Sequence, residues 1–460
     1  MTTAILIMIS VMKILTIIFN FKRKMFSSFF EYKKRTDVLT FIVLLDIINI
    51  VDLGDFMDRI IMHIDVNNAF LSWTAIYLLN NGYKYDIRDS YAVIGGDEKT
   101  RNGIVLAKSI PAKKMGIYTS ETLYSARKKC PALKCYPPNY LFYSEMSDKL
   151  FKLLNKYTPD IEVASIDECY LDYTPVKNIY GDEVEFAKKI QKEIYDTLKF
   201  TVNIGIANNK LCAKMASDFE KPFKIHTLYD YEVKKKMWPL PIGDLFGIGK
   251  RSAEKLINLG IKDIAALANA DVNYLSKYFK NQAINMVNSA NGIDNSRVVS
   301  EASVAKSIGN EITLEHDVSN KEELKKHLLY ISDKVARRLR NDNKYAYVVV
   351  LVLKDKYFVR KSKQKKLNNP TNVTEDIYNT SVEILNSIDN MEPVRLIGIQ
   401  LTNLVDTCDH QVSLFEDIDI VENNEVLDKT IDTLKDKYGS SILKKASLMN
   451  VKDRRRLHDK

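Results

Sequence analysis

Apolar and polar positions follow two different periods along the first half of the chain. The largely apolar run from Arg59 to Ile64 predicts a strand, and the apolar spacing from Ala69 to Asn80 predicts a helix. Alternating stretches that predict short strands then occur among amphipathic helices as far as residue 219. This mixture predicts an α+β fold in which helices cover one face of a sheet.

The second half contains two further patterns. From Tyr231 to about Val298 the apolar spacing is helical, with short turns. From Ser307 the pattern predicts the order βαββαβ, which is typical of a small ferredoxin-like domain. The predicted strands cover 308–314, 345–353, a stretch from 357, and 395–404, and the predicted helices cover 321–340 and 374–388.

The first 56 residues differ from the rest. The apolar runs 4–19 and 38–53 are short for a membrane span, which needs about 20 apolar residues, and each contains a charge. The basic cluster at 22–24 follows the first run, whereas the charges of a signal peptide precede its apolar region. Because Met57 directly precedes the first predicted strand, we interpret residues 1–56 as upstream sequence included through an early start codon. A helical appendage is the alternative, and a membrane anchor is less favoured; we expect no membrane contact for the core.

Composition excludes several classes of protein. The length of 460 residues predicts about three globular domains. The hydrophobic fraction of 46% is too high for a disordered chain. The five cysteines lie far apart without a CxxC pair, which argues against a disulfide framework or a structural zinc site. We therefore expect a reducing, cytoplasmic location. The net charge of +9 suggests a polyanionic partner.

Two acidic positions stand out because each follows or interrupts an apolar strand. Asp65 ends the first predicted strand, and Asp167 and Glu168 lie together between two strands of a predicted hairpin. Adjacent carboxylates in a half-buried hairpin repel one another and lose hydration unless a cation neutralises them. Three such groups could hold Mg²⁺, and two ions could serve an in-line phosphoryl displacement. Taken singly, each position is better explained as a solvated acid at a strand end.

A glycine-containing turn supplies the third signal. The stretch from Leu245 to Lys250 reads LFGIGK and joins two predicted helices. Glycines let backbone N–H groups approach a phosphate, and the following helix N-terminus adds its dipole. Gly247, Gly249 and Lys250 resemble the helix-hairpin-helix element that binds a DNA backbone without reading its sequence.

Taken together, these segments are similar to Y-family translesion DNA polymerases of the DNA polymerase IV (DinB/UmuC) class, over Met57 to about Asp417. The motifs that carry the resemblance are HIDVNNAF (63–70), VLAKSIPAKKMGI (105–117), ASIDECYLD (164–172), GIANNKLCAKMASDFEKP (205–222), FGIGKRSAEKLINLGI (246–261) and KSIGNE (306–311).

The resemblance implies an α+β right-hand polymerase with small fingers, a helical thumb and a little-finger domain of βαββαβ order. The palm is an antiparallel sheet with helices. The implied boundaries are palm 57–68 and 139–228, fingers 69–138, thumb 229–297, linker 298–306, little finger 307–407 and tail 408–460. It also implies a monomeric, low-fidelity enzyme that extends primer-template DNA with deoxynucleoside triphosphates and uses two Mg²⁺ ions.

The resemblance assigns roles to single residues. Asp65, Asp167 and Glu168 match the metal-binding carboxylates, and the carbonyl of Val66 matches the backbone ligand. Phe70 is at the steric-gate position, where an aromatic ring excludes the 2′-hydroxyl of a ribonucleotide; from the pattern alone it would be a helix-core residue.

Further matches concern the incoming triphosphate. Lys221 matches the lysine that holds it, although a solvated helix-end lysine is the alternative. Ile110 and Lys113 replace the family's usual Tyr and Arg. Lys113 can supply a point charge but no bidentate fork, and Lys108 or Lys114 could compensate.

Positive charge is concentrated in the predicted little finger. Residues 321–366 contain fifteen Lys or Arg against five Asp or Glu, a net of +10. Arg360, Lys361 and Lys363 belong to a run with charge on both faces of a strand, which a solvated edge explains only in part. We expect this sheet to contact duplex phosphates, with a steep salt dependence.

A short peptide follows the predicted folded part. Gln411, Ser413, Leu414 and Phe415 belong to the sequence QVSLF, which resembles the peptide that inserts into the pocket of the bacterial sliding clamp. An exposed Leu-Phe pair in an acidic tail has no other evident purpose. The resemblance therefore implies a bacterial sliding clamp as partner.

Two other functions remain as alternatives. Gly95-Gly96-Asp97-Glu98 resembles the signature of palm-fold nucleotide cyclases, but here it lies in a predicted turn. A catalytically inactive DNA-binding or clamp-binding module is the other alternative, against which the three carboxylates argue.

Overall fold

The computed structural model describes residues 59–97, 101, 103–301, 305–407, 418–439 and 442–443. The N-terminal extension 1–56 and the segment with Gln411, Ser413, Leu414 and Phe415 lie outside these residues. Within the described part, no helix is long and apolar enough to cross a membrane.

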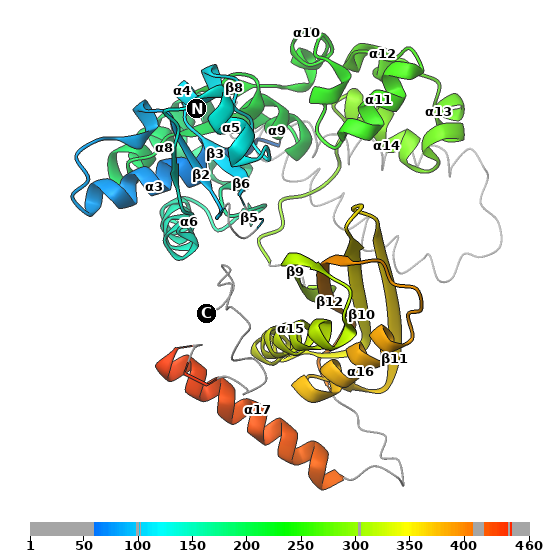
Figure 1. The fold of residues 1–460 in the computed structure, drawn as a ribbon. Helices are drawn as coiled ribbons and strands as arrows, with labels where there is room; N and C mark the ends of the chain where they lie inside the picture. Colours follow the sequence, from blue (N-terminus) through cyan, green and yellow to red (C-terminus); the bar gives the residue numbers. More distant parts are fainter. Residues whose placement is uncertain are drawn as a thin grey trace, which may run out of the picture.

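The palm is a five-stranded sheet in the order β5-β6-β1-β7-β8 (Figure 1). Its central strand β1 pairs antiparallel with β6 and β7, and the outer strand β8 runs parallel to β7. The strands are β1 (Ile61–Val66), β5 (Ile161–Val163), β6 (Glu168–Asp172), β7 (Val202–Ala207) and β8 (Ile225–Thr227). All six residues of β1 are buried, so both faces of the sheet are covered.

Helices cover the two faces of this sheet separately. Helices α6 (Tyr140–Leu154) and α8 (Glu183–Leu198) share one apolar core with Met62 and Ile64, whereas α9 (Lys210–Asp218) packs against Ile61 on the other face. The prediction of helices on one face was therefore wrong. Gly205 of β7 explains the second layer, because a Cβ there would lie 2.0 Å from the carbonyl oxygen of Ala213. Only a residue without a side chain lets α9 approach so closely.

The fingers contain a three-stranded sheet in the order β3-β2-β4. It consists of β2 (Ala92–Gly95), β3 (Val105–Lys108) and β4 (Lys134–Tyr136), with helices α4 (Ile110–Lys114) and α5 (Leu123–Lys129). Helix α3 (Ala69–Asn80) has the predicted bounds and joins the two parts: Trp73 packs in the palm core and Leu71 in the fingers core.

The thumb is helical, as predicted. It contains α10 (Val233–Lys236), α11 (Lys250–Asn258), α12 (Ile264–Ala268), α13 (Val272–Phe279) and α14 (Gln282–Ala290). Cys212 of α9 and Leu256 of α11 belong to one apolar core, so the thumb is attached to the palm face that α9 covers.

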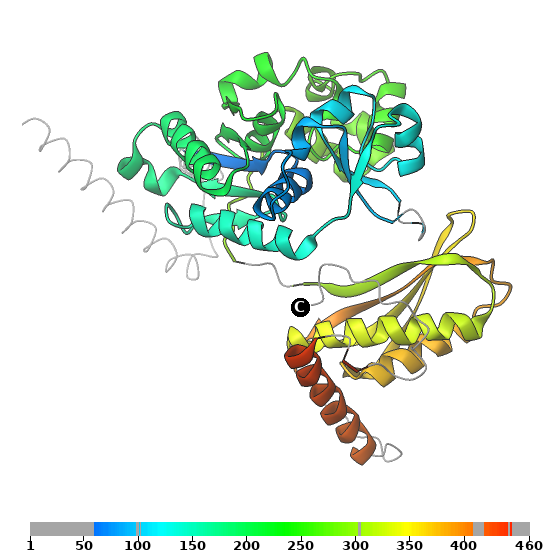
Figure 2. The same ribbon diagram turned by 60° about the vertical axis from the view of Figure 1, so that its left-hand side comes forward.

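The little finger has the predicted βαββαβ order. It comprises β9 (Ser307–Val318), α15 (Lys321–Asn341), β10 (Tyr345–Asp355), β11 (Arg360–Thr371), α16 (Thr374–Asn386) and β12 (Val394–Val405). The sheet order is β11-β10-β12-β9, and each neighbouring pair is antiparallel. Both helices lie on one face of this sheet (Figure 2).

Two features concern the segments predicted as tail and linker. Helix α17 (Ile418–Tyr438), in the stretch predicted as a tail, lies against the helical side of the little finger (Figure 1). The linker from the thumb is fixed to the palm, because the Val299 amide donates to Glu162 Oε2 at 2.9 Å. Lys210 also holds the Glu162 carboxylate, at 2.7 Å.

Candidate functional site

Three carboxylates from separate segments meet at one end of the palm sheet. Asp65 and Glu168 are direct partners across the antiparallel strands β1 and β6. The amide of Val66 donates to the carbonyl oxygen of Asp167 at 3.0 Å, which places Asp167 beside the end of β1. Register and one backbone hydrogen bond therefore bring together the acids predicted from the sequence.

Cationic and polar groups hold each of these carboxylates. Lys221 Nζ forms an ion pair with Asp65 Oδ2, and Lys214 Nζ lies 2.9 Å from Glu168 Oε2. Ser165 Oγ donates to Asp167 Oδ1 at 2.7 Å. The fully buried His63 places Nε2 3.4 Å from Glu168 Oε2, while its Nδ1 lies 2.8 Å from Ser217 Oγ.

The carboxylates differ in their affinity for protons. The contact with His63 and the ion pair with Lys214 lower the pKa of Glu168 to about 2, although burial acts in the opposite direction. Burial raises the pKa of Asp167, and the negative charges of Asp65 and Glu168 raise it further. Burial also lowers the pKa of His63, which favours a neutral ring beside Glu168.

A metal ion would compete with the lysines for these acids. Among the described residues, no group of three or more His, Cys, Asp or Glu side chains is arranged to hold a metal. The chemistry of the donor set nevertheless fits Mg²⁺: the carboxylates are hard oxygen ligands, and Asp65 and Glu168 are direct cross-strand partners beside Asp167.

The loop that carries Lys221 is fixed by two buried amides that the sequence analysis missed. Asn203 donates to the carbonyl oxygens of Ser217 and Glu220 at 3.0 and 2.7 Å. Its own Oδ1 accepts from Asn67 Nδ2 and from the amide of Lys224, both at 3.1 Å. Asn203 is the partner of Asp65 in the β1–β7 register, so one strand pair positions both the acid and the lysine loop.

Phe70 lies at the first turn of α3 in a group of aromatic rings. Its ring stacks on Tyr143 with centroids 4.7 Å apart and meets the edge of Tyr140 at 6.0 Å. Asn68 Nδ2 donates to the carbonyl oxygen of Lys108 at 2.7 Å, which fixes the start of α3 to the fingers strand β3. The ring is thus held in a defined place, half-buried, next to the carboxylate end of β1.

The fingers place Ile110 and Lys113 on the short helix α4. Ile110 is 54% exposed, so it is not a core residue, and Lys113 is also exposed. Burial lowers the pKa of Lys108, and the positive charge of Lys113 lowers it further. Lys108 Nζ donates to Thr119 Oγ1 at 3.0 Å.

The predicted thumb element is an exposed loop before α11. Gly247 has φ +89°, and a Cβ at Gly247 or Gly249 would meet no atom within 4 Å. Gly249 is the N-cap of α11 and offers no side chain, so the first amides of the helix point into open space. Lys250 is exposed at the same end.

The little-finger cations do not share one face. Lys363 Nζ donates to the carbonyl oxygen of Ser387 after α16, so its side chain lies on the helical side. Lys361 lies on the same side because it is two residues from Lys363, whereas Arg360 points to the open face and pairs with Glu311 of β9.

The cyclase-like sequence Gly95-Gly96-Asp97-Glu98 lies in the fingers. Gly95 ends β2, away from the palm sheet, and Glu98 lies outside the described residues.

The chain is similar to known proteins over most of its length. Family models match at 64–218 (impB/mucB/samB family), 231–261 (IMS family HHH motif) and 305–414 (impB/mucB/samB family C-terminal domain). The chain is 45% identical over 399 residues to a DNA polymerase IV of Clostridium acetobutylicum, an alignment that covers 86% of this chain and 100% of that protein. It is 33% identical over 402 residues to DNA polymerase IV 1 of Bacillus subtilis, covering 86% and 94%. A solved Y-family DNA polymerase chimera matches with a TM-score of 0.66 and 26% identity, covering 76% of this chain and all of the chimera.

The substitution Asn203→Ala tests the role of the buried amide. It removes four hydrogen bonds at a fully buried position, so we expect the free energy of unfolding to fall by at least about 2 kcal/mol. Urea unfolding measures this change. Asn269→Ala, which removes one exposed hydrogen bond to Ala265, is the control and should change stability by less than about 0.5 kcal/mol. Equal midpoints for the two variants would contradict the assigned role.

Proposed function

The chain belongs to the Y family of DNA polymerases and is a translesion DNA-directed DNA polymerase, and from this premise we propose that Asp65, Asp167 and Glu168 form its catalytic centre. The observation that carries the proposal is the pairing of Asp65 with Glu168 across β1 and β6, with Asp167 hydrogen-bonded to the end of β1. A binding module without activity has no need for three crowded acids at an accessible sheet end.

The family depends on divalent metal ions, and the proposed ligands are the three carboxylates and the carbonyl of Val66. Two bound Mg²⁺ ions would lower the pKa of the primer 3′-hydroxyl and stabilise the departing pyrophosphate. The role of His63 and Lys214 is to orient Glu168 and to keep it ionised, because both lower its pKa. Lys221 is paired with Asp65 and Asp218, from which it can turn to a triphosphate.

Substrate selection rests on groups around this centre. Phe70 is the proposed steric gate, whose ring would contact the sugar of the incoming nucleotide, and its stacking on Tyr143 at 4.7 Å supports a fixed ring position. Lys113 and Lys108 supply two point charges in place of one guanidinium fork. The fingers sheet has only three short strands, and small fingers of this kind would be consistent with lesion tolerance and low fidelity.

Two domains supply the proposed DNA contacts. The exposed amides after Gly247 and Gly249, with Lys250, are available for a backbone phosphate. Arg360 lies on the open face of the little-finger sheet, where it would exchange its ion pair with Glu311 for a phosphate. Lys361 and Lys363 lie on the other side of the sheet and could reach phosphate only around the exposed edge strand β11. Such contacts would give steep salt dependence without sequence preference.

Recruitment by a sliding clamp is supported by the sequence QVSLF alone. Gln411, Ser413, Leu414 and Phe415 lie between β12 and α17, outside the described residues. The proposed occupant of the clamp pocket is the Leu414-Phe415 pair.

Primer extension with Mg²⁺ tests the catalytic assignment. We expect Asp167→Ala to lower the rate about a thousandfold, because loss of one metal ligand removes several kcal/mol of charge stabilisation. Asp148→Ala, which changes an exposed carboxylate of α6, should retain the parent rate. Equal rates for the parent and Asp167→Ala would refute the assignment, and no synthesis by the parent would favour the inactive module.

Sugar discrimination tests the gate. Phe70→Ala should raise the incorporation of ribonucleotides relative to deoxyribonucleotides by roughly tenfold or more, because the clash with the 2′-hydroxyl is lost. Single-nucleotide incorporation measures the ratio. Phe70→Tyr keeps the ring and should keep the discrimination of the parent. An unchanged ratio in Phe70→Ala would show that another residue excludes the ribose.

Clamp recruitment requires a separate experiment. The double substitution Leu414→Ala and Phe415→Ala should abolish the stimulation of synthesis by a bacterial sliding clamp while leaving synthesis without the clamp unchanged, because only the apolar anchors are lost. Glu416→Ala with Asp417→Ala is the matched control. Full stimulation of the Leu414/Phe415 variant would exclude this peptide as the clamp ligand.

A further inference from the structure

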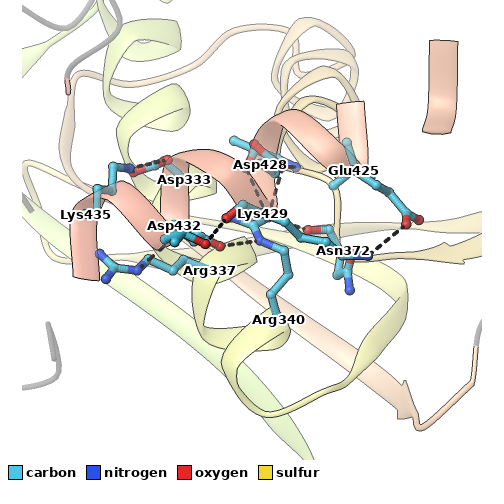
Figure 3. Close-up of polar contacts among 12 residues, drawn as sticks. Asp333, Arg337, Arg340, Asn372, Glu425, Asp428, Lys429, Asp432 and Lys435 are labelled. Atoms are coloured by element: carbon cyan, nitrogen blue, oxygen red, sulfur yellow. Dashed lines mark hydrogen bonds and ion pairs between the residues drawn. The ribbon is translucent and has the colours of Figure 1, made fainter. Parts of the chain in front are cut away.

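Helix α17 is attached to the little finger by charged side chains (Figure 3). Among its described side chains the buried ones are Asp428, Asp432 and Lys435, which share one face of the helix by their spacing. In contrast, Leu427 and Tyr438 are 55% and 58% exposed. The helix therefore turns its charged stripe inward, which reverses the usual orientation of an amphipathic helix.

The receiving surface is a matching stripe on α15. Asp333, Arg337 and Arg340 are spaced four and three residues apart and so lie on one face of that helix. Lys435 Nζ lies 2.8 Å from Asp333 Oδ2 at one end of the contact. At the other end Arg340 Nε lies 2.6 Å from Asp432 Oδ2, and Arg340 Nη1 lies 3.0 Å from Asp428 Oδ2.

The order of charges determines how the two helices can pair. Along α15 the charges of Asp333, Arg337 and Arg340 are negative, positive and positive. Helix α17 runs in the opposite direction, and its facing residues Lys435, Asp432 and Asp428 carry the complementary charges positive, negative and negative. Arg337 lies between the ends and pairs with Asp432 and Asp436. A shift of one turn in either direction, or a parallel arrangement, would place like charges together.

Burial makes such a mismatch costly. The side chain of Arg340 is 6% exposed, and those of Asp428 and Asp432 are 11% exposed. A buried charge that loses its partner is strongly unfavourable, whereas a correctly paired one adds little net stability. Charged contacts of this kind therefore favour one register of α17 on α15, while their contribution to the net free energy of folding is small.

The little finger does not need α17 for its core. The apolar core of this domain draws its residues from β9 to β12 with α15 and α16, and no described α17 side chain belongs to it. Besides the ion pairs with α15, Asp428 Oδ2 accepts from the amide of Thr374 at 2.8 Å, at the start of α16, where Val373 offers no side-chain cap.

We propose that α17 is a self-docking strap, whose position on α15 is selected by the order of charges in the two stripes and which can leave and return while the little finger stays folded. The partner of the α15 stripe is thus a segment of the same chain. When the strap leaves, Arg337 and Arg340 lose their acidic cover, so the helical side of the little finger becomes more cationic.

The Asp333–Lys435 pair offers the cleanest test, because both residues can be exchanged without removing the Asp428 contact to Thr374. The full-length variants are Asp333→Lys, Lys435→Asp and the double exchange, and hydrogen exchange by mass spectrometry reports amide protection in α17 and in β10 and β12. Lys437→Asp is the matched control for Lys435→Asp, since Lys437 is exposed in the same last turn of α17 and about half a helical turn away from Lys435.

Each single exchange should accelerate amide exchange in 424–438 at least tenfold, and the double exchange should restore protection above that of either single variant. Protection of β10 and β12, and of all segments in Lys437→Asp, should stay at the parent level. Unchanged protection in the single variants, or no recovery in the double variant, would overturn selection by charge. Loss of protection in β10 and β12 together with α17 would show that the helix is an integral part of the domain.

Discussion

The mutual repulsion of three carboxylates is the constraint on which the rest of the palm depends. Asp65, Asp167 and Glu168 can share one sheet end only if positive charge is close, and helix α9 with the loop after it supplies Lys214 and Lys221. That helix reaches the sheet because Gly205 has no side chain. The second helical layer, the buried amide network at Asn203 and the attachment of the thumb follow from the same close approach.

Long elements with a strong apolar period were predicted from the sequence almost to the residue, as α3 and α15 show. The strands β4 and β8 were not, because each has only three residues and pairs in parallel with a strand distant in the chain. A short polar segment of this kind has no periodicity of its own, and only the completed sheet stabilises it.

The residues of the candidate site also fall into those that the sequence could predict and those that it could not. The three acids were predictable because a carboxylate at the end of an apolar strand has no packing role. His63, Asn203 and Lys214 were not, since a buried histidine, an asparagine in a strand and a lysine in a helix have many ordinary explanations. Their roles depend on which strands are neighbours, which is a property of the fold and not of local sequence.

More of the positive charge of the little finger is held in ion pairs than its sequence suggests. Arg337 and Arg340 face α17, Arg360 pairs with Glu311, and Lys365 pairs with Glu383. The net charge of +10 in 321–366 is therefore partly neutralised by acids from other segments.

The hydrogen bond from the Val299 amide to Glu162 fixes the point on the palm from which the linker continues to the little finger. Because the linker is fixed to the palm before it continues, a movement of the thumb is not passed directly along the chain to the little finger. From Val299 to Ser307 the chain makes eight Cα–Cα steps, which can span about 28 Å at most. Among the described residues an ion pair also joins the fingers to the little finger, from Arg101 Nη1 to Asp317 Oδ1 at 2.7 Å. The thumb and the little finger are therefore attached to the palm at separate points, and the length of the stretch from Val299 to Ser307 limits how far the little finger can move away from Glu162.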